Sequence, residues 1–381
     1  MSLRRALRET LAAAALACMA LSGAGWAGTC TDDASSAAPS VYRVCMPDPF
    51  PGWNGDLVVF AHGYVAPGDP VAIPEGQLVL PDGTSIPALV TGLGYAFATT
   101  SYPENGLVIP EAVGDIVHLV HYFTTSQGQP RRVLLVGASE GGLATALAVE
   151  QYPEVFAGGL ATCGPVGDFR SQLNHVGDFR VVFDYFFPRL LPGSPVSVPA
   201  ELMANWETNY APLIATAIAT RPHATEQLLR VTRAPVDPAD PASAAETVLG
   251  ILWYNVFATN DAIARLGGQP YDNSRRLYLG SDNDFLLNLV VPRFRANPLA
   301  LAAIQSGFLT SGRLSSPLVT VHTTGDPIVP YGQEPLYTLK TILAGSARRH
   351  VELPVFRYGH CNFEADEVLT AFKLLAYLAG R

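Results

Sequence analysis

Residues 132–142 read RVLLVGASEGG, and this stretch is the strongest indication of the fold in the sequence. Residues 133–136 form a continuous apolar run, which is typical of a strand covered on both faces. The run leads directly into the pattern G-x-S-x-G with Ser139 at its centre, and a helix is expected over residues 143–151. A serine on such a tight strand-to-helix turn projects its hydroxyl toward a ligand at the N-terminus of the helix, whose dipole favours negative charge. The stretch therefore predicts a nucleophilic serine at the edge of a sheet.

A glycine-rich strand-to-helix turn can also bind phosphate. Loops of that kind carry the fuller patterns G-x-G-x-x-G or G-x-x-x-x-G-K. Neither pattern surrounds Ser139, and the two lysines of the chain, Lys340 and Lys373, are far away in sequence. The nucleophile interpretation is therefore favoured over the phosphate-binding one.

The alternation of short buried strands and helices continues on both sides of this stretch. Strands are expected over residues 41–46, 56–61, 95–100, 132–136, 156–162, 317–322 and 351–357, and helices over 85–93, 111–125, 143–151, 334–343 and 364–378. The pattern predicts an α/β fold with a mostly parallel sheet and helices on both faces.

The alternation breaks at about residue 164. Residues 165–312 are rich in aromatic residues, prolines and helical patterns. We therefore expect one core domain, formed by residues 28–164 and 313–381, with a large, mainly helical lid at residues 165–312 inserted between two of its strands. Residues 28–40 are small and polar and are expected to form a tether.

A serine nucleophile needs a general base and an acid that orients it. Asp326 follows the strand expected to end at residue 322, and His360 follows the next strand. The carboxyl ends of parallel strands meet at one edge of the sheet, so both side chains are expected beside Ser139. His322, inside the strand, is the one competing histidine. Asp326 as a simple turn former before proline and His360 as an ordinary loop histidine are the alternative interpretations.

The tetrahedral intermediate of such a reaction needs preorganised hydrogen-bond donors. The backbone N–H of Glu140, which follows the candidate nucleophile, is expected to be one of them. The second is expected from the loop after residues 56–61, where the sequence reads His-Gly-Tyr, and we assign it to the N–H of Tyr64.

The chain also begins with the pattern of an export signal. Arg4, Arg5 and Arg8 precede a short apolar segment, residues 11–21, and small residues follow up to Ala27. This pattern predicts a signal peptide over residues 1–27 and a secreted or periplasmic protein, with a lipoprotein anchored at Cys18 as the alternative.

Cysteine usage agrees with export. Apart from Cys18 there are four cysteines, an even number, and the two that are close in sequence are expected to pair as Cys30–Cys45, which leaves Cys163–Cys361. Free buried thiols are the alternative. The sequence has no C-x-x-C and no H-E-x-x-H pattern, so neither a metal nor a cofactor is expected.

Composition excludes several classes of partner. The 381 residues are 49% hydrophobic and 15% charged, with a net charge of −9, which argues against disorder and against a basic face for nucleic acid. Outside the leader no apolar stretch of about 20 residues is present, so no stable membrane insertion is expected. The expected partner is a small-molecule or polymeric substrate, and the sequence leaves the oligomeric state open.

Four sequence motifs together resemble the α/β-hydrolase superfamily. They are Phe-Ala-His-Gly at residues 60–63, Gly-Ala-Ser-Glu-Gly at residues 137–141, the run Gly-Asp-Pro-Ile-Val-Pro at residues 325–330, and Gly-His at residues 359–360. The chain is similar to secreted bacterial serine esterases with a large lid between core strands six and seven, and more loosely to prolyl-oligopeptidase-like enzymes. It lacks the N-terminal propeller-length domain of the latter.

This resemblance implies a carboxylesterase or lipase-like serine hydrolase. The expected substrates are apolar or aromatic esters, with polyesters among them, and the expected acyl-enzyme forms on Ser139. A serine peptidase or amidase with the same triad is the alternative, and a non-catalytic binding protein on a hydrolase scaffold is the third hypothesis.

Overall fold

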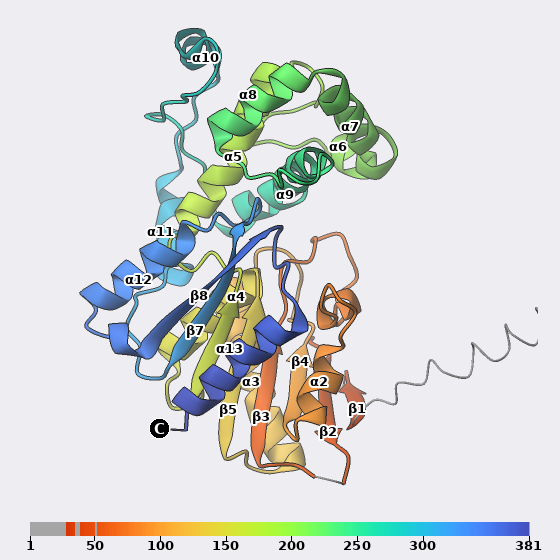
Figure 1. Ribbon diagram of the computed structural model, residues 1–381, viewed down its shortest axis with the longest axis vertical. Coiled ribbons are helices and arrows are strands. Elements are labelled where there is room, and N and C mark those ends of the chain that lie inside the picture. Colours follow the sequence, from red (N-terminus) through yellow and green to blue (C-terminus); the bar gives the residue numbers. More distant parts are fainter. Residues whose placement is uncertain (1–27, 35–38, 50–51, 381) are drawn as a thin grey trace, which may run out of the picture.

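A computed structural model describes residues 28–34, 39–49 and 52–380 of the chain. The expected signal peptide at residues 1–27, with the alternative lipidation site at Cys18, lies outside the described residues. Figure 1 shows a sheet flanked by helices, with a group of helices above one end of the strands.

Within the described residues, eight strands form one sheet in the order β1-β2-β4-β3-β5-β6-β7-β8. Their bounds are β1 Gly28–Asp33, β2 Tyr42–Pro47, β3 Asp56–Ala61, β4 Ala96–Thr100, β5 Arg132–Ala138, β6 Gly158–Thr162, β7 Leu318–Gly325 and β8 His350–Tyr358. From β4 to β8 all neighbours are parallel, whereas β2 is antiparallel to both β1 and β4. The expected mostly parallel sheet is confirmed.

The tether expected over residues 28–40 is wrong in its first half. Strand β1 pairs along its whole length with β2, with Cys30 opposite Cys45. Its residues, GTCTDD, are polar and at least partly exposed because β1 is an edge strand. Backbone pairing and the disulfide hold it in place, and neither leaves a hydrophobic pattern in the sequence.

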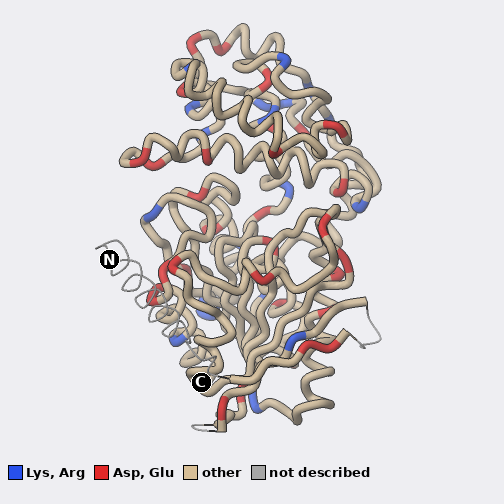
Figure 2. The backbone as a smooth tube through the Cα atoms, turned by 90° about the vertical axis from the view of Figure 1, so that its right-hand side faces the viewer, with Lys and Arg blue, Asp and Glu red and all other residues tan. Residues whose placement is uncertain are grey.

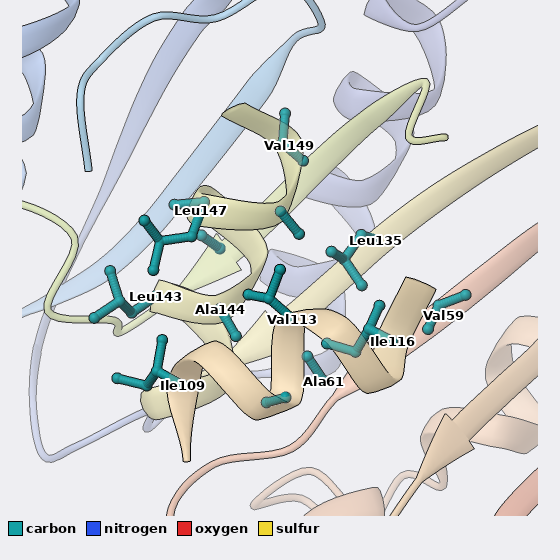
Figure 3. Close-up of a cluster of buried hydrophobic side chains, with 14 of the residues drawn as sticks. Val59, Ala61, Ile109, Val113, Ile116, Leu135, Leu143, Ala144, Leu147 and Val149 are labelled. Carbon is teal, nitrogen blue, oxygen red and sulfur yellow. The ribbon is translucent and has the colours of Figure 1, made fainter. Parts of the chain in front are cut away.

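Helices cover both faces of the sheet. The core helices are η1 Glu75–Leu78, α2 Ile86–Gly92, α3 Ile109–Gln127, α4 Glu140–Gln151, α12 Gln333–Leu343, η3 Ala347–Arg349 and α13 Ala365–Leu378. Helices α3 and α4 pack on one face, where Val59 and Leu135 meet Ile116 and Leu147 in a fully buried apolar layer (Figure 3). Helices α2 and α13 cover the opposite face. Burial on both faces explains why the central strands read as continuous apolar runs.

The chain between β6 and β7 is mainly helical, and we keep the name lid for residues 165–312. Its helices are α5 Phe169–Phe186, α6 Ala200–Ala204, η2 Trp206–Tyr210, α7 Ala211–Thr220, α8 Pro222–Thr232, α9 Ser243–Arg265, α10 Asp284–Val290 and α11 Pro298–Gly307. Helices α5 to α9 lie above the carboxyl ends of the strands (Figure 1) and share their own apolar cluster, which includes Phe183, Leu228 and Ile251. The lid therefore covers the sheet edge to which the candidate site residues were assigned.

Charged residues are dispersed over the fold. In Figure 2 the Lys and Arg residues are scattered among Asp and Glu residues in both the core and the lid. Among the described residues, no helix combines the length and the hydropathy that a membrane span requires.

Candidate active site

Ser139 occupies the turn between β5 and α4 with φ 57° and ψ −120°, a backbone conformation that side-chain-bearing residues rarely adopt. Two glycines make this turn possible. A Cβ atom at Gly137 would lie 2.1 Å from the carbonyl oxygen of Gly141, and one at Gly141 would lie 2.1 Å from the carbonyl oxygen of Ala61. The glycines of the G-x-S-x-G pattern therefore allow the helix to begin directly against the sheet, with a partly buried Ser139 at the turn.

His360 and Asp326 follow β8 and β7, and both reach Ser139 through hydrogen bonds. His360 Nε2 lies 2.9 Å from Ser139 Oγ, and His360 Nδ1 lies 2.7 Å from Asp326 Oδ2. Because the carboxylate only accepts, Nδ1 carries the proton in the neutral ring, and Nε2 accepts from the serine hydroxyl. The structure thus brings the three residues expected at one sheet edge into a single hydrogen-bonded chain.

Asp326 is fully buried and fixed by its own backbone turn. Its Oδ1 atom accepts hydrogen bonds from the N–H groups of Ile328 at 2.8 Å and Val329 at 2.9 Å. Burial alone would raise the pKa of this carboxyl group, but the charge and hydrogen bond of His360 and the hydrogen bond of His322 lower it to about 2. Asp326 is therefore ionised throughout the range in which His360 can act as a base.

The two amides expected to bind an oxyanion are available. Gln77 fixes the loop that carries one of them, because its Oε1 accepts from the N–H of Gly63 at 2.6 Å and its Nε2 donates to the carbonyl of Tyr64 at 3.2 Å. A Cβ atom at Gly63 would lie 3.1 Å from the Cβ atom of Ser139, so the loop runs close to the serine. Among the described residues, neither the N–H of Tyr64 nor that of Glu140 has a protein acceptor.

Comparison with known families decides the fold assignment. Residues 90–175, which include Ser139 and the turn around it, match the model of the prolyl oligopeptidase family. The parallel sheet, the strained serine after β5 and the order Ser…Asp…His agree with this match. The chain has the α/β-hydrolase fold. The family match includes Ser139 and therefore supports serine-hydrolase chemistry at this site.

Solved structures resemble this fold at low sequence identity. An acylaminoacyl peptidase in complex with Z-Gly-Gly-Phe-chloromethyl ketone is 13% identical with a TM-score of 0.48, and the match covers 93% of this chain but only 41% of that one. Candida antarctica lipase A in its closed state is 15% identical with a TM-score of 0.46, covering 90% and 74%. An esterase from Pyrococcus furiosus is 9% identical with a TM-score of 0.46, covering 92% and 90%. A search of curated proteins gives no significant match.

The structure contains both disulfide bonds expected from the sequence. Cys30–Cys45 joins β1 and β2 at one edge of the sheet, and Cys163–Cys361 joins the residue after β6 to the residue after His360. The second bond lies in the site itself, since Cys361 Sγ is 3.6 Å from His360 Nε2. Among the described residues, Cys163, His360 and Cys361 have ligand atoms close enough to share a metal ion, but the two sulfur atoms are bonded to each other.

A buried charge cluster lies behind the candidate site. His322 is completely buried, with Nδ1 3.1 Å from Glu334 Oε1 and Nε2 2.9 Å from the carbonyl oxygen of Val329 and 3.4 Å from Asp326 Oδ2. Both ring nitrogens face acceptors, so the ring is a donor on both sides. Burial would lower the pKa of His322, but Asp326 and Glu334 outweigh burial and raise it to about 10. His322 is therefore not a competing base but a cation that supports Asp326.

Glu140 brings a carboxyl group next to the nucleophile. Its side chain is buried, and its Oε1 accepts a hydrogen bond from the N–H of Val108 at 3.0 Å. Burial raises the pKa of Glu140 to about 8. The group is therefore neutral near pH 7 and adds no negative charge where an oxyanion would form.

Tyr254 is a site residue that sequence reasoning missed. It lies on α9 of the lid, within hydrogen-bonding reach of Ser139, and burial raises the pKa of its phenol. It was one of many aromatic residues in the lid sequence, and no local pattern separates it from those that only pack. Glu334 was missed, and His322 was expected only as a competing histidine, because the two residues meet through the packing of α12 against the sheet.

Proposed function

We propose that this protein is a secreted carboxylic-ester hydrolase in which Ser139 is the nucleophile, His360 the general base and Asp326 the acid that orients it. The observation that carries the proposal is the hydrogen-bonded chain from Asp326 through His360 to Ser139, with distances of 2.7 Å and 2.9 Å. Only a positioned base activates a serine hydroxyl at neutral pH.

In the first half-reaction, Ser139 Oγ attacks the carbonyl carbon of the ester and its proton moves to His360 Nε2. The carbonyl oxygen becomes an oxyanion and accepts hydrogen bonds from the N–H groups of Tyr64 and Glu140. The bond to the alcohol oxygen then breaks, and His360 Nε2 donates its proton to that oxygen. This leaves an acyl-enzyme on Ser139 and a neutral alcohol.

In the second half-reaction a water molecule replaces the alcohol. His360 Nε2 takes a proton from the water as its oxygen attacks the acyl carbon, and the proton returns to Ser139 Oγ as the acid leaves. Asp326 remains an anion throughout and stabilises the imidazolium form of His360 in both halves.

Apolar and aromatic esters fit the surroundings of Ser139 best. The space beside it is lined mainly by apolar side chains of the lid and the sheet, including Leu173, Val196 and Leu160. An apolar lining favours substrates that have few polar groups to desolvate. Polyesters of such units are included in the proposal.

The decisive test is Ser139→Ala, with Ser126→Ala on the exposed side of α3 as the matched control. We expect Ser139→Ala to lose at least about 10³-fold in kcat on p-nitrophenyl acetate while keeping its circular dichroism spectrum. A fluorophosphonate probe should label the wild type and the control at Ser139. A substantial residual rate in Ser139→Ala would overturn the assignment of the nucleophile.

Peptide or amide hydrolysis is the second candidate, and the match of residues 90–175 to the prolyl oligopeptidase family favours it. A panel that pairs each ester with the amide of the same acid separates the two functions. We expect the esters to be hydrolysed faster by more than the difference in their intrinsic reactivity. A clear preference for peptides would reverse the ranking.

Export is tested by the N-terminus of the mature protein. We expect cleavage after Ala27 and recovery of activity from the medium or the periplasm. A mature chain that begins with a lipid-modified Cys18 would instead establish the lipoprotein alternative.

A further inference from the structure

Two cavities meet at Ser139, and their walls come from different parts of the molecule. The lid cavity, of about 110 Å³, lies between α5, α9 and the loop after β7. The sheet cavity, of about 380 Å³, lies between the sheet and the helices α2 and α13. Ser139, Tyr64 and Tyr254 line both cavities, so a group bonded to Ser139 can extend into each of them.

The floor of the sheet cavity is one face of three parallel strands. Its lining residues are Val58 and Phe60 in β3, Val136 and Ala138 in β5, and Leu160 and Thr162 in β6. Alternate residues of a strand point to the same face, so these pairs form a continuous apolar surface. Leu89 of α2 and Leu369 of α13 line the cavity from the helix layer. The cavity is thus an unfilled space within the apolar layer under the site, and the lid contributes Tyr254 at its upper end.

His360 lines only one of the two cavities. His360 and Cys361 line the sheet cavity, whereas the lid cavity has Glu140 and Val329 beside Ser139 and lacks His360. In the proposed reaction, His360 Nε2 must donate a proton to the oxygen of the leaving alcohol. The alcohol therefore departs on the side of the sheet cavity, and the acyl group occupies the lid cavity.

The polar atoms of the sheet cavity are already engaged. Both polar atoms of the Gln77 side-chain amide form hydrogen bonds with the loop of Gly63 and Tyr64. Thr162 Oγ1 donates to the carbonyl of Gly137 at 3.1 Å. A peptide in this cavity would leave its own N–H and C=O groups without partners, which costs free energy. A hydrocarbon leaving group carries no such cost.

The lid cavity differs in having free acceptors. The side-chain amides of Gln172 and Gln269 donate to the carbonyls of Ile328 and Arg295, which fixes their orientation. Their Oε1 atoms are buried and have no hydrogen-bond partner among the residues that the structure describes. Both residues line the lid cavity, so a donor on the acyl group would satisfy an oxygen that otherwise stays unpaired.

From this arrangement we propose that the substrate is an ester of a short acid bearing a hydroxyl or amide N–H donor, with a large apolar alcohol that fills the sheet cavity. The inference rests on the proposed ester hydrolysis at Ser139. A cavity of about 150 Å³ in another protein holds one benzene molecule. By that measure the lid cavity, about 110 Å³, holds an acyl group of a few carbons, and the sheet cavity, about 380 Å³, holds a much larger group.

The alcohol side is tested with acetate esters of methanol, butanol and octanol. We expect kcat/KM to rise about fourfold for each methylene that the sheet cavity buries. Leu369→Trp and, from the other helix, Leu89→Trp should lower the octyl-to-methyl ratio of kcat/KM at least tenfold. Leu343→Trp, on the exposed side of α12, is the matched control and should keep the wild-type ratio. A flat series in the wild type, or an unchanged ratio in both folded cavity variants, would overturn the proposal.

The acid side is tested with methyl butyrate and methyl 3-hydroxybutyrate. We expect the hydroxy ester to be preferred about threefold to tenfold in kcat/KM, and Gln172→Leu or Gln269→Leu to remove that preference. Gln151→Leu, at the exposed end of α4, should retain it. Equal rates for the two esters in the wild type would refute the proposal that the acyl group carries a hydrogen-bond donor.

Labelling of Ser139 by a fluorophosphonate distinguishes a failure of the proposal about the two cavities from a failure of the proposed function. If a fluorophosphonate labels Ser139 and esters are hydrolysed without these preferences, only the proposal about the two cavities fails. If Ser139 is not labelled and Ser139→Ala keeps full activity, the proposed function itself fails.

Discussion

His322 Nε2 lies 3.4 Å from Asp326 Oδ2, the same oxygen that accepts the hydrogen bond from His360. On its other side His322 contacts Glu334 at 3.1 Å. With His322 protonated, one positive charge is buried with two carboxylates, so the cluster carries a net negative charge until His360 takes up a proton. The cluster therefore favours the imidazolium that His360 becomes during attack by Ser139.

We predict that His322→Gln destabilises the protein and slows the reaction. Removing one member of a buried ionic cluster costs about 3–5 kcal/mol, because the remaining charges stay buried without their partner. The free energy of unfolding follows from urea titration, and kcat on p-nitrophenyl acetate should fall with little change in KM. His223→Gln is the control, since His223 bonds Asp282 at 2.7 Å on the exposed surface. Equal stability of the two variants would contradict the prediction.

The same histidine gives stability a pH dependence. The pKa of His322 is raised from 6.5 to about 10 in the folded state, so its stabilising contribution is complete below about pH 6.5 and is lost as pH rises through 10. The free energy of unfolding of the wild type should therefore fall between pH 7 and 10. In His322→Gln this decline should be much smaller, and an identical decline in both proteins would show that another group causes it.

We predict that Asp326→Asn keeps the fold but lowers kcat by about 10³- to 10⁴-fold. The asparagine oxygen can still accept from the N–H groups of Ile328 and Val329. Its amide nitrogen would face His360 Nδ1, however, and would favour the tautomer whose Nε2 carries the proton and cannot accept from Ser139. Kinetics and circular dichroism measure the two effects, and Asp282→Asn on the lid surface is the control. Activity close to that of the wild type would remove Asp326 from the proposed triad.

Much of the core and of the site geometry can be predicted from the sequence because it depends on local patterns. The strand expected over residues 56–61 matches β3, and the helix expected over residues 364–378 matches α13 to within one residue. Ser139, Asp326 and His360 each directly follow a strand of a parallel sheet. That topology alone places them at one edge, and the structure joins them by hydrogen bonds.

Other features depend on contacts that leave no local pattern. Helix α5 runs over Phe169–Phe186, although Gly177, a residue with low helix propensity, lies in its middle. Gly177 packs against the ring of Tyr271, and a Cβ atom at this position would lie 2.3 Å from the ring. The close packing of the two residues therefore requires a glycine within the helix. The sheet cavity is hidden in the same way, since Val136 and Leu160 read as ordinary core residues and the space between them and the helices is a tertiary property.

We predict that Glu140→Gln extends activity to higher pH. Burial raises the pKa of Glu140 to about 8, so the folded state loses stability as pH rises from about 4.5 to 8, and the carboxylate that forms near pH 8 repels the developing oxyanion. Glutamine keeps the bond from the N–H of Val108 and stays neutral. The pH profile of kcat should lose its fall near pH 8 in Glu140→Gln and keep it in the exposed control Glu154→Gln. A fall at the same pH in both variants would assign it to another group.

We predict that the two disulfide bonds have different roles. By the chain-entropy argument, removing Cys163–Cys361, whose cysteines are 198 residues apart, costs about 5 kcal/mol, and removing Cys30–Cys45, 15 residues apart, costs about 3 kcal/mol. Only the first bond fixes the loop of His360, since Cys361 follows it directly. The pair of substitutions Cys163→Ala and Cys361→Ala should therefore lower kcat about tenfold to a hundredfold at a temperature where the protein stays folded.

The pair Cys30→Ala and Cys45→Ala is the matched control for that measurement. It removes a disulfide at the far edge of the sheet, between β1 and β2, so the unfolding midpoint should fall while kcat stays at the wild-type value. Thiol counting of the denatured, unreduced protein should find none of these four cysteines free. Two free thiols at Cys163 and Cys361, or equal losses of kcat in the two double variants, would show that this bond does not position His360.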